Sequence, residues 1–310
     1  MRSLELCAGC GGMSLGLTRA GFEPLLLVEQ DAHCVATLRA NGWRHVLHAD
    51  LRGVDFRPYK GRVDLVAGGV PCQPFSVCGL DEGKDDARNL FEEAIRCVRE
   101  CEPRGFLFEN VSGLAREQFA PYVESITCRL AALGYRVQLH LADASRHGVA
   151  QRRRRCLLVG VRGGDDGDFE APSPSAEATT VREMMRALGP PNGVNRHEVR
   201  AHAARSYANH LPSRLDAPAK TVLAGCNGPG GGNNCVMLDD GRVRYFTLRE
   251  LARLQGFPDS YVLAPVWSHA VKQLGNAAPP PLVYEFAKKL APLLKRAPAR
   301  APRPRRRQSS

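Results

Sequence analysis

Short apolar runs alternate with longer amphipathic stretches along the first half of this chain. The apolar runs, several of them rich in Leu and Val, predict buried strands at 2–6, 24–28, 46–49, 63–67, 105–108 and 156–161. The spacing of apolar residues predicts amphipathic helices over 89–100 and 116–133. Because strands that alternate with helices form sheets covered on both faces, we predict an α/β fold with a doubly wound, mostly parallel sheet.

The pattern changes after about residue 163. Between 163 and 212, Gly, Asp, Pro and Ser, and then scattered His and Arg, replace the apolar runs. Residues 243–257 predict a helix that ends near Gly256, with Thr247 to Glu250 in an opening turn. A last helix over about 280–294 is expected to pack back on the first domain. We therefore assign 1–162 plus 270–294 to one domain and 163–269 to a smaller one.

Cys72 is the strongest candidate for chemistry in the chain. It lies in Gly-Gly-Val-Pro-Cys-Gln-Pro-Phe-Ser at 68–76, directly after a predicted strand. Proline fixes its own φ and pushes the preceding residue towards extended geometry, so a stiff loop presents the thiol where open α/β sheets bind ligands. A cysteine can also be a packing residue, but a core thiol needs no such scaffold. We predict that Cys72 is a nucleophile.

Three successive strand ends carry residues suited to a nucleotide-like ligand. A glycine-rich turn at 9–12 follows the first strand, and its backbone amides can approach such a ligand closely. Glu29 ends the second strand, about twenty residues on, where an acidic residue commonly binds ribose hydroxyls. Asp50 ends the third. Each carboxylate alone could be a solvated loop end or a helix cap, but together the three sites predict a crevice for a cofactor that contains an adenosine.

These motifs, in this order, resemble the bacterial C5-cytosine-specific DNA methyltransferase family. The resemblance runs from about residue 4 to 290. Its motifs are Leu-Cys-Ala-Gly-Cys-Gly-Gly at 6–12, Val-Glu-Gln-Asp at 28–31, Ala-Asp-Leu at 49–51, Val-Pro-Cys-Gln-Pro-Phe-Ser at 70–76, Asp-Ala-Arg-Asn-Leu-Phe at 86–91, Phe-Glu-Asn-Val at 108–111, Gln-Arg-Arg-Arg-Arg at 151–155, Leu-Asp-Ala-Pro-Ala-Lys-Thr-Val at 215–222 and Gly-Asn-Ala-Ala-Pro-Pro-Pro at 275–281.

The resemblance implies a Rossmann-like methyltransferase domain that binds S-adenosyl-L-methionine. The cofactor contacts that it implies are Cys7, Ala8, Gly9, Gly11, Gly12, Glu29, Gln30, Asp50, Leu51, Leu90 and Asn276. Two of them depart from the common pattern of the family. Cys7 stands where many relatives carry phenylalanine, and Gln30 replaces a common tryptophan, so the packing around the adenine is expected to differ.

The chemistry of cytosine agrees with this resemblance. Carbon 5 is a poor nucleophile, and adding a thiolate at carbon 6 gives an enamine-like species that can attack a sulfonium methyl group. Such a step requires Cys72 as a thiolate and a second group that protonates ring nitrogen 3. Glu109, at the end of a predicted strand, suits that role, although by itself it could be a capping or salt-bridge residue. The base that removes the carbon 5 proton is not identified.

An arginine-rich run at 151–155 precedes the predicted strand 156–161. If it begins that strand, alternation places Gln151, Arg153 and Arg155 on one face. The resemblance implies that this face points into the active site, where Arg153 and Arg155 contact the target nucleotide and help to orient the glutamate. A phosphate-binding or solvated basic cluster is the other interpretation, and we favour it for Arg152 and Arg154.

Duplex DNA is the expected partner. Because a cytosine within a duplex is out of reach of the thiol, we expect the base to be flipped out of the stack. The sequence context is then read elsewhere, by 163–213 and the glycine-rich stretch 225–234 of the target-recognition domain 163–269. The expected DNA contacts are Gln73, Ser76, Gln151, Arg196, Arg200 and Arg205. We also expect a monomer, which could act with a cognate restriction endonuclease.

Net charge and cysteine content bear on DNA affinity, metal binding and the cellular compartment. The net charge is +11, but 295–310 holds seven basic residues and no acidic ones, so the body carries only +4. That tail is expected to be disordered, and to add DNA affinity or to be inert. The 11 cysteines lack zinc-finger spacing, so we expect no metal. The chain shows neither an export leader nor a long apolar run. We therefore expect it in the reducing cytoplasm, where cysteines stay as free thiols.

Two alternatives remain open. A tRNA cytosine C5 methyltransferase of the same superfamily would use the same covalent chemistry, with a recognition segment that reads folded RNA. A DNA-binding relative without catalysis would keep the fold, but Cys72, Glu109 and Arg153 are all present. A nicotinamide dehydrogenase is excluded mainly by the Pro-Cys-Gln loop. The incomplete glycine motif argues against it less strongly.

Overall fold

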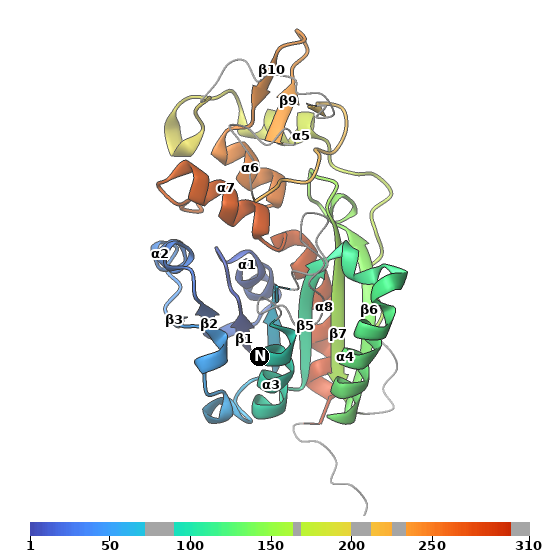
Figure 1. Ribbon diagram of the computed structural model, residues 1–310. Helices are drawn as coiled ribbons and strands as arrows, with labels where there is room; N and C mark the ends of the chain where they lie inside the picture. The colour runs from blue at the N-terminus through green and yellow to red at the C-terminus, as the bar shows by residue number, and fades with distance from the viewer. Residues whose placement is uncertain (72–89, 164–168, 200–211, 225–233, 299–310) are drawn as a thin grey trace, which may run out of the picture.

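The protein folds around a seven-stranded sheet covered by helices, with a smaller three-stranded sheet at one end (Figure 1). This computed structural model describes residues 1–71, 90–163, 169–199, 212–224 and 234–298. The strands of the large sheet are β1 (Arg2–Leu6), β2 (Glu23–Glu29), β3 (Val46–His48), β4 (Leu65–Gly68), β5 (Gly105–Val111), β6 (Tyr135–Asp143) and β7 (Arg154–Arg162).

The order of these strands is β3-β2-β1-β4-β5-β7-β6. Strands β3 to β5 pair in parallel, and β7 is antiparallel to both β5 and β6. The predicted doubly wound, mostly parallel sheet is therefore confirmed. Strand β6 was not predicted, because it lies at the edge of the sheet and most of its residues are only half-buried, which weakens the apolar pattern.

The register brings four strand ends to one level. Leu6 of β1 pairs with Val28 of β2 and with Gly68 of β4, and Gly68 pairs in turn with Phe108 of β5. The residues that follow these four positions therefore emerge at the same edge of the sheet. In parallel sheets this carboxyl edge is where ligands bind.

Helices cover both faces of the sheet. They are α1 (Gly12–Arg19), α2 (Ala32–Ala40), α3 (Phe91–Cys101), α4 (Ala120–Ala132) and α8 (Pro280–Arg296). Figure 1 shows α3 and α4 in front of the sheet and α8 behind it. Alternate residues of β5 serve the two cores, since Phe106 and Phe108 pack with α3 and α4 whereas Leu107 packs with α1 and α8.

The remaining elements form a second unit with its own core. Its sheet has the order β10-β9-β8, formed by β8 (Ser213–Arg214), β9 (Cys235–Met237) and β10 (Val243–Tyr245). Helices α5 (Val181–Leu188), α6 (Leu248–Gln255) and α7 (Trp267–Asn276) pack with this sheet around buried residues such as Leu251, Leu254 and Leu274. In Figure 1 this unit lies above the carboxyl edge of the large sheet.

The helix predicted over 243–257 begins later than expected. Residues 243–245 form strand β10 instead, antiparallel to β9. A capping box sets the actual start, because the Thr247 hydroxyl accepts from Glu250 N at 3.0 Å and the Glu250 carboxylate accepts from Thr247 N at 2.8 Å. Gly256, at φ 85°, ends the helix as predicted.

The last helix extends beyond its predicted end. Helix α8 continues to Arg296, with Leu290 and Leu294 fully buried, so the first residues of the predicted disordered tail are helical. Residues 299–310 of that tail lie outside the described part of the chain. No helix within the described ranges is long and apolar enough to cross a membrane.

Candidate active site

A cavity of about 390 Å³ opens at the carboxyl edge of the large sheet. It is lined by the residues that follow β1, β2, β4 and β5, and on the other side by the carboxyl end of α7. Most of the predicted cofactor residues lie here, namely Cys7, Ala8, Gly9, Gly12, Glu29, Gln30, Leu51, Leu90 and Asn276. The cavity therefore gathers residues that are far apart in the sequence.

Gly11 and Asp50 belong to the same turns but do not line the cavity. Gly11 has φ 86°, and a Cβ there would lie 2.6 Å from Tyr261 Oη, so the position needs glycine for backbone reasons. The exposed Asp50 carboxylate accepts from Arg52 N at 3.0 Å, and this hydrogen bond lowers its pKa. Asp50 thus caps the 3₁₀ turn Leu51–Gly53.

Glu29 ties the glycine turn to the end of β2. Its two carboxylate oxygens accept from Gly9 N at 2.7 Å and from Asp31 N at 2.8 Å. Each carboxylate oxygen can accept a further hydrogen bond, so Glu29 can also bind hydroxyl groups in the cavity.

Glu5 is a cavity residue that the sequence analysis missed. It is 2% exposed, and its Oε2 accepts from Ser14 Oγ at 2.5 Å. Its Oε1 has no hydrogen-bond partner among the described residues. Burial raises the pKa of Glu5 to about 8. An acidic residue between the two leucines of β1, Leu4 and Leu6, was the signal that could have revealed it.

Glu109 and Arg155 form an ion pair at the cavity wall. Arg155 Nε lies 2.8 Å from Glu109 Oε1, and both side chains are largely buried. The contact is diagonal across neighbouring strands, because Glu109 of β5 pairs with Leu157 of β7 and Arg155 lies two residues before Leu157. The predicted proximity of the glutamate and this arginine is present.

The residues on either side of the segment 72–89 are fixed by hydrogen bonds. Asn110 Nδ2 donates to Val70 O at 2.8 Å, and Leu90 N donates to Pro71 O at 3.2 Å. Val70, Pro71 and Leu90 all line the cavity together with Glu109. Cys72 follows Pro71 in the chain, but Cys72, Gln73 and Ser76 lie outside the described residues.

Arg153 also lines the cavity, but its described contacts are to backbone. It is 1% exposed and donates to Val222 O at 3.1 Å, Gly275 O at 2.6 Å and Ala277 O at 3.0 Å. Burial holds its pKa well below the ordinary value for arginine. Arg153 therefore joins the start of β7 to two segments that lie on the opposite wall of the cavity.

The expected DNA contacts are only partly described. Gln151 is fully buried, where it donates to Leu254 O at 2.7 Å and accepts from Val222 N at 2.7 Å, so it does not reach a surface. Arg196 donates to Pro265 O at 2.9 Å and lies in a turn of left-handed backbone. Arg200 and Arg205 lie outside the described residues.

The sheet order β3-β2-β1-β4-β5-β7-β6, with β7 antiparallel, is a Rossmann-like fold that this chain shares with methyltransferases. Two solved structures share the fold at low sequence identity. A Dnmt2 methyltransferase of S. pombe has TM-score 0.70 and 18% identity, covering 94% of this chain and 99% of that one. A DNMT2 mutant of Spodoptera frugiperda has TM-score 0.74 and 17% identity, covering 95% and 99%.

Sequence comparison identifies the family. The model of the C-5 cytosine-specific DNA methylase family matches residues 1–212 and 191–291. The type II methyltransferase M.NgoMIV of Neisseria gonorrhoeae is 37% identical, over 95% of this chain and 98% of its own length. M.NaeI of Lentzea aerocolonigenes is 32% identical, over 93% and 74%. The chain belongs to the C-5 cytosine-specific DNA methylase family and is a DNA (cytosine-5-)-methyltransferase.

Proposed function

We propose that this enzyme methylates carbon 5 of a cytosine flipped out of duplex DNA, with Cys72 as a covalent nucleophile. The observation that carries the proposal is the cavity itself. The stem of the Cys72 segment and the Glu109–Arg155 pair open onto the same space as the glycine turn and Glu29. The proposed acid and the proposed cofactor groups thus share one space, and Cys72 follows Pro71, a residue of the same cavity, in the chain.

The residues present fit S-adenosylmethionine. The cavity has the size of a small-molecule site, about 300–1,000 Å³. Glu29 offers carboxylate oxygens to a ribose, and the unpartnered Oε1 of buried Glu5 offers an acceptor to an ammonium group. When bound, the cofactor supplies an electrophilic methyl group. The chain's own contribution is to bind it and to make carbon 5 of the base nucleophilic.

Cys72 and Glu109 divide the activation of the base between them. The thiolate of Cys72 forms a bond to carbon 6 while the pair of electrons released moves to ring nitrogen 3, where Glu109 delivers a proton or a hydrogen bond. Arg155 holds the Glu109 carboxyl in place across the strands. After methyl transfer, loss of the carbon 5 proton to a base or water expels the thiolate, and the proton on ring nitrogen 3 returns to Glu109, which restores the ring.

DNA recognition falls to the second unit in this proposal. Residues 163–269, which include the three-stranded sheet and most of the core around it, form the proposed target-recognition domain, and 1–162 plus 270–294 form the proposed catalytic domain. Unstacking a base costs a few kcal/mol, which contacts to the surrounding DNA must supply. Because relatives are named type II methyltransferases, we also propose that a cognate endonuclease reads the same sequence in the cytoplasm. The enzyme is proposed to act as a monomer.

Bisulfite sequencing of DNA from a methylation-free host that expresses the chain tests the function. We expect 5-methylcytosine in one sequence context, and none with Cys72→Ala. DNA that carries 5-fluorocytosine in this context should form a covalent adduct with the native enzyme, because fluorine blocks the elimination. Methylation of host tRNA but not of DNA would instead support the tRNA alternative, and turnover by Cys72→Ala would refute the covalent mechanism.

A further inference from the structure

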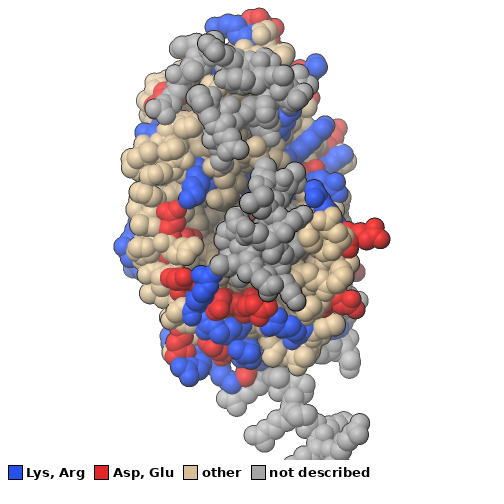
Figure 2. All heavy atoms as spheres, viewed as in Figure 1, with Lys and Arg blue, Asp and Glu red and all other residues tan. Residues whose placement is uncertain are grey.

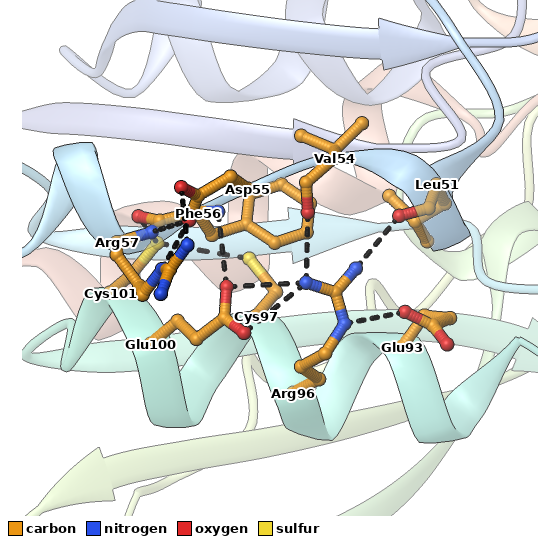
Figure 3. Close-up of polar contacts among 10 residues, drawn as sticks. All are labelled: Leu51, Val54, Asp55, Phe56, Arg57, Glu93, Arg96, Cys97, Glu100 and Cys101. Atoms are coloured by element: carbon orange, nitrogen blue, oxygen red, sulfur yellow. Dashed lines mark hydrogen bonds and ion pairs between the residues drawn. The ribbon is translucent and has the colours of Figure 1, made fainter.

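One face of helix α3 holds the segment that carries Leu51. Arg96, in the middle of α3, donates to two backbone carbonyls of that segment, from Nη2 to Leu51 O at 2.8 Å and from Nη1 to Val54 O at 2.8 Å (Figure 3). Farther along the same face, Cys101 Sγ donates to Phe56 O at 3.6 Å. The segment 51–56 therefore lies along α3, and side chains of the helix bind its backbone carbonyls.

Two glutamates one turn on either side orient the guanidinium. Arg96 Nε donates to Glu93 Oε2 at 2.7 Å, and Arg96 Nη1 lies 3.2 Å from Glu100 Oε2. Glu100 Oε2 also accepts from Phe56 N at 3.0 Å, so Glu100 binds the same segment directly. The three charged side chains are only about a fifth exposed, at 19–21%, so water screens these contacts less than it would on an open surface.

The charges around α3 are paired with one another. Figure 2 shows basic and acidic side chains intermixed over the lower part of this face, where α3 lies in Figure 1. The described ion pairs there include Arg52–Asp50, Arg57–Asp55, Arg96–Glu93 and Arg129–Glu92. Because these pairs neutralise each other, Arg96 serves the fold of this region and is not one of a set of free cations awaiting phosphate.

Leu51 connects this network to the cavity. It is 3% exposed, and it lines the cavity at the point where the chain leaves β3. On the upstream side, the chain is held by Ala49 N, which donates to Glu29 O at 3.1 Å. Downstream, within the described residues, the Leu51 carbonyl accepts from Val54 N at 3.3 Å and from Arg96 Nη2 at 2.8 Å.

We propose that Arg96 is a positioning residue for the cofactor, which fixes the Leu51 wall of the cavity without touching the ligand. The planar fork of arginine suits this role, because one guanidinium reaches two carbonyls and two carboxylates that a lysine could not reach together. The proposal rests on the cofactor site proposed above. It predicts that Arg96 governs cofactor affinity more than DNA affinity or the rate of the chemical step.

Calorimetric titration with S-adenosylhomocysteine, which has the same adenosine and is not consumed, tests this directly. A hydrogen bond to a charged group is worth roughly ten- to a hundredfold in an equilibrium constant, and we expect Arg96→Gln to weaken binding by about tenfold. The affinity of Arg96→Lys should lie between those of the native enzyme and Arg96→Gln. The matched control is Arg99→Gln, which removes an exposed arginine from the same helix and should leave affinity unchanged.

Steady-state kinetics with the same variants separates positioning from general damage. We expect Arg96→Gln to raise KM for S-adenosylmethionine while KM for DNA and kcat at saturation stay near their native values. An equal rise in both KM values, or unchanged cofactor affinity in folded Arg96→Gln, would overturn the proposal. If Arg96→Gln does not fold, Glu93→Ala decides, because it removes the acceptor that orients Arg96 Nε, which glutamine would keep through its amide oxygen. Unchanged affinity there refutes the proposal, whereas a native enzyme that fails to methylate DNA refutes the function instead.

Discussion

At the scale of single residues, Glu109 is the group whose removal should damage chemistry most selectively. Glu109→Gln keeps the shape of the side chain beside Arg155 but leaves a group that can neither take up nor transfer a proton. General acid catalysis is worth roughly 100- to 10,000-fold, so we expect single-turnover methylation to slow by that order. Binding of S-adenosylhomocysteine should change little. A variant with native single-turnover rate would limit Glu109 to a structural role.

Glu5 makes a different prediction, about stability and pH. Its folded pKa of about 8 lies above the usual value of 4.5, so the folded protein favours the protonated carboxyl. The stability that this contributes is complete below pH 4.5 and is lost as pH rises through about 8. Glu5→Gln cannot titrate. Its stability relative to the native protein should therefore rise by roughly 2–4 kcal/mol between pH 5 and 8.

Urea unfolding of both proteins without cofactor, at several pH values over this range, checks the prediction. The slope of the difference is diagnostic, because lost contacts in the variant shift all values alike. Parallel stability curves would mean that Glu5 is already ionised in the folded protein.

At the scale of elements, the sequence predicted those whose signals are local. Strands β2, β4 and β5 contain nearly continuous apolar runs, and Gly256 marks the end of α6. The sequence could not show which residues, far apart in the chain, come into contact. Gln151 and Arg153 lie in one short motif, yet Gln151 is buried against α6 whereas Arg153 reaches the cavity. Their partners, near 222, 254 and 275, are set only by the packing of the two units.

The packing of α1 on α8 gives a prediction at this scale. A Cβ at Gly16 would lie 2.6 Å from Val283 Cβ and 2.7 Å from Pro280 O, so the helices can approach only because this residue is glycine. Gly16→Ala should push them apart and destabilise the protein by roughly 1–3 kcal/mol, the usual cost of overpacking. Thermal unfolding measures this, and an unchanged midpoint for Gly16→Ala would show that the two helices have room for a methyl group at this position.

For the whole molecule, the cavity and the second unit are expected to make separable contributions. If the cavity takes up the target cytosine, as proposed, it meets the same base whatever the surrounding DNA sequence, so we assign the reading of sequence context to 163–269. Arg196, Arg200 and Arg205 are the candidate contacts. The hydrogen bond from Arg196 to Pro265 O makes a structural or phosphate-binding role more apt for it than base reading.

Alanine variants at these three arginines distinguish the roles. A residue that reads a base should, when replaced, relax the methylated context at one position, with a cost of about 1–3 kcal/mol for the preferred site. One that binds phosphate should weaken all contexts alike and reduce the slope of log affinity against log salt by about 1. Both quantities come from binding titrations at several salt concentrations and from sequencing of methylated plasmid libraries. If all three variants kept the native context and salt slope, while substitutions in α4 altered the context, the assignment of recognition to 163–269 would be wrong.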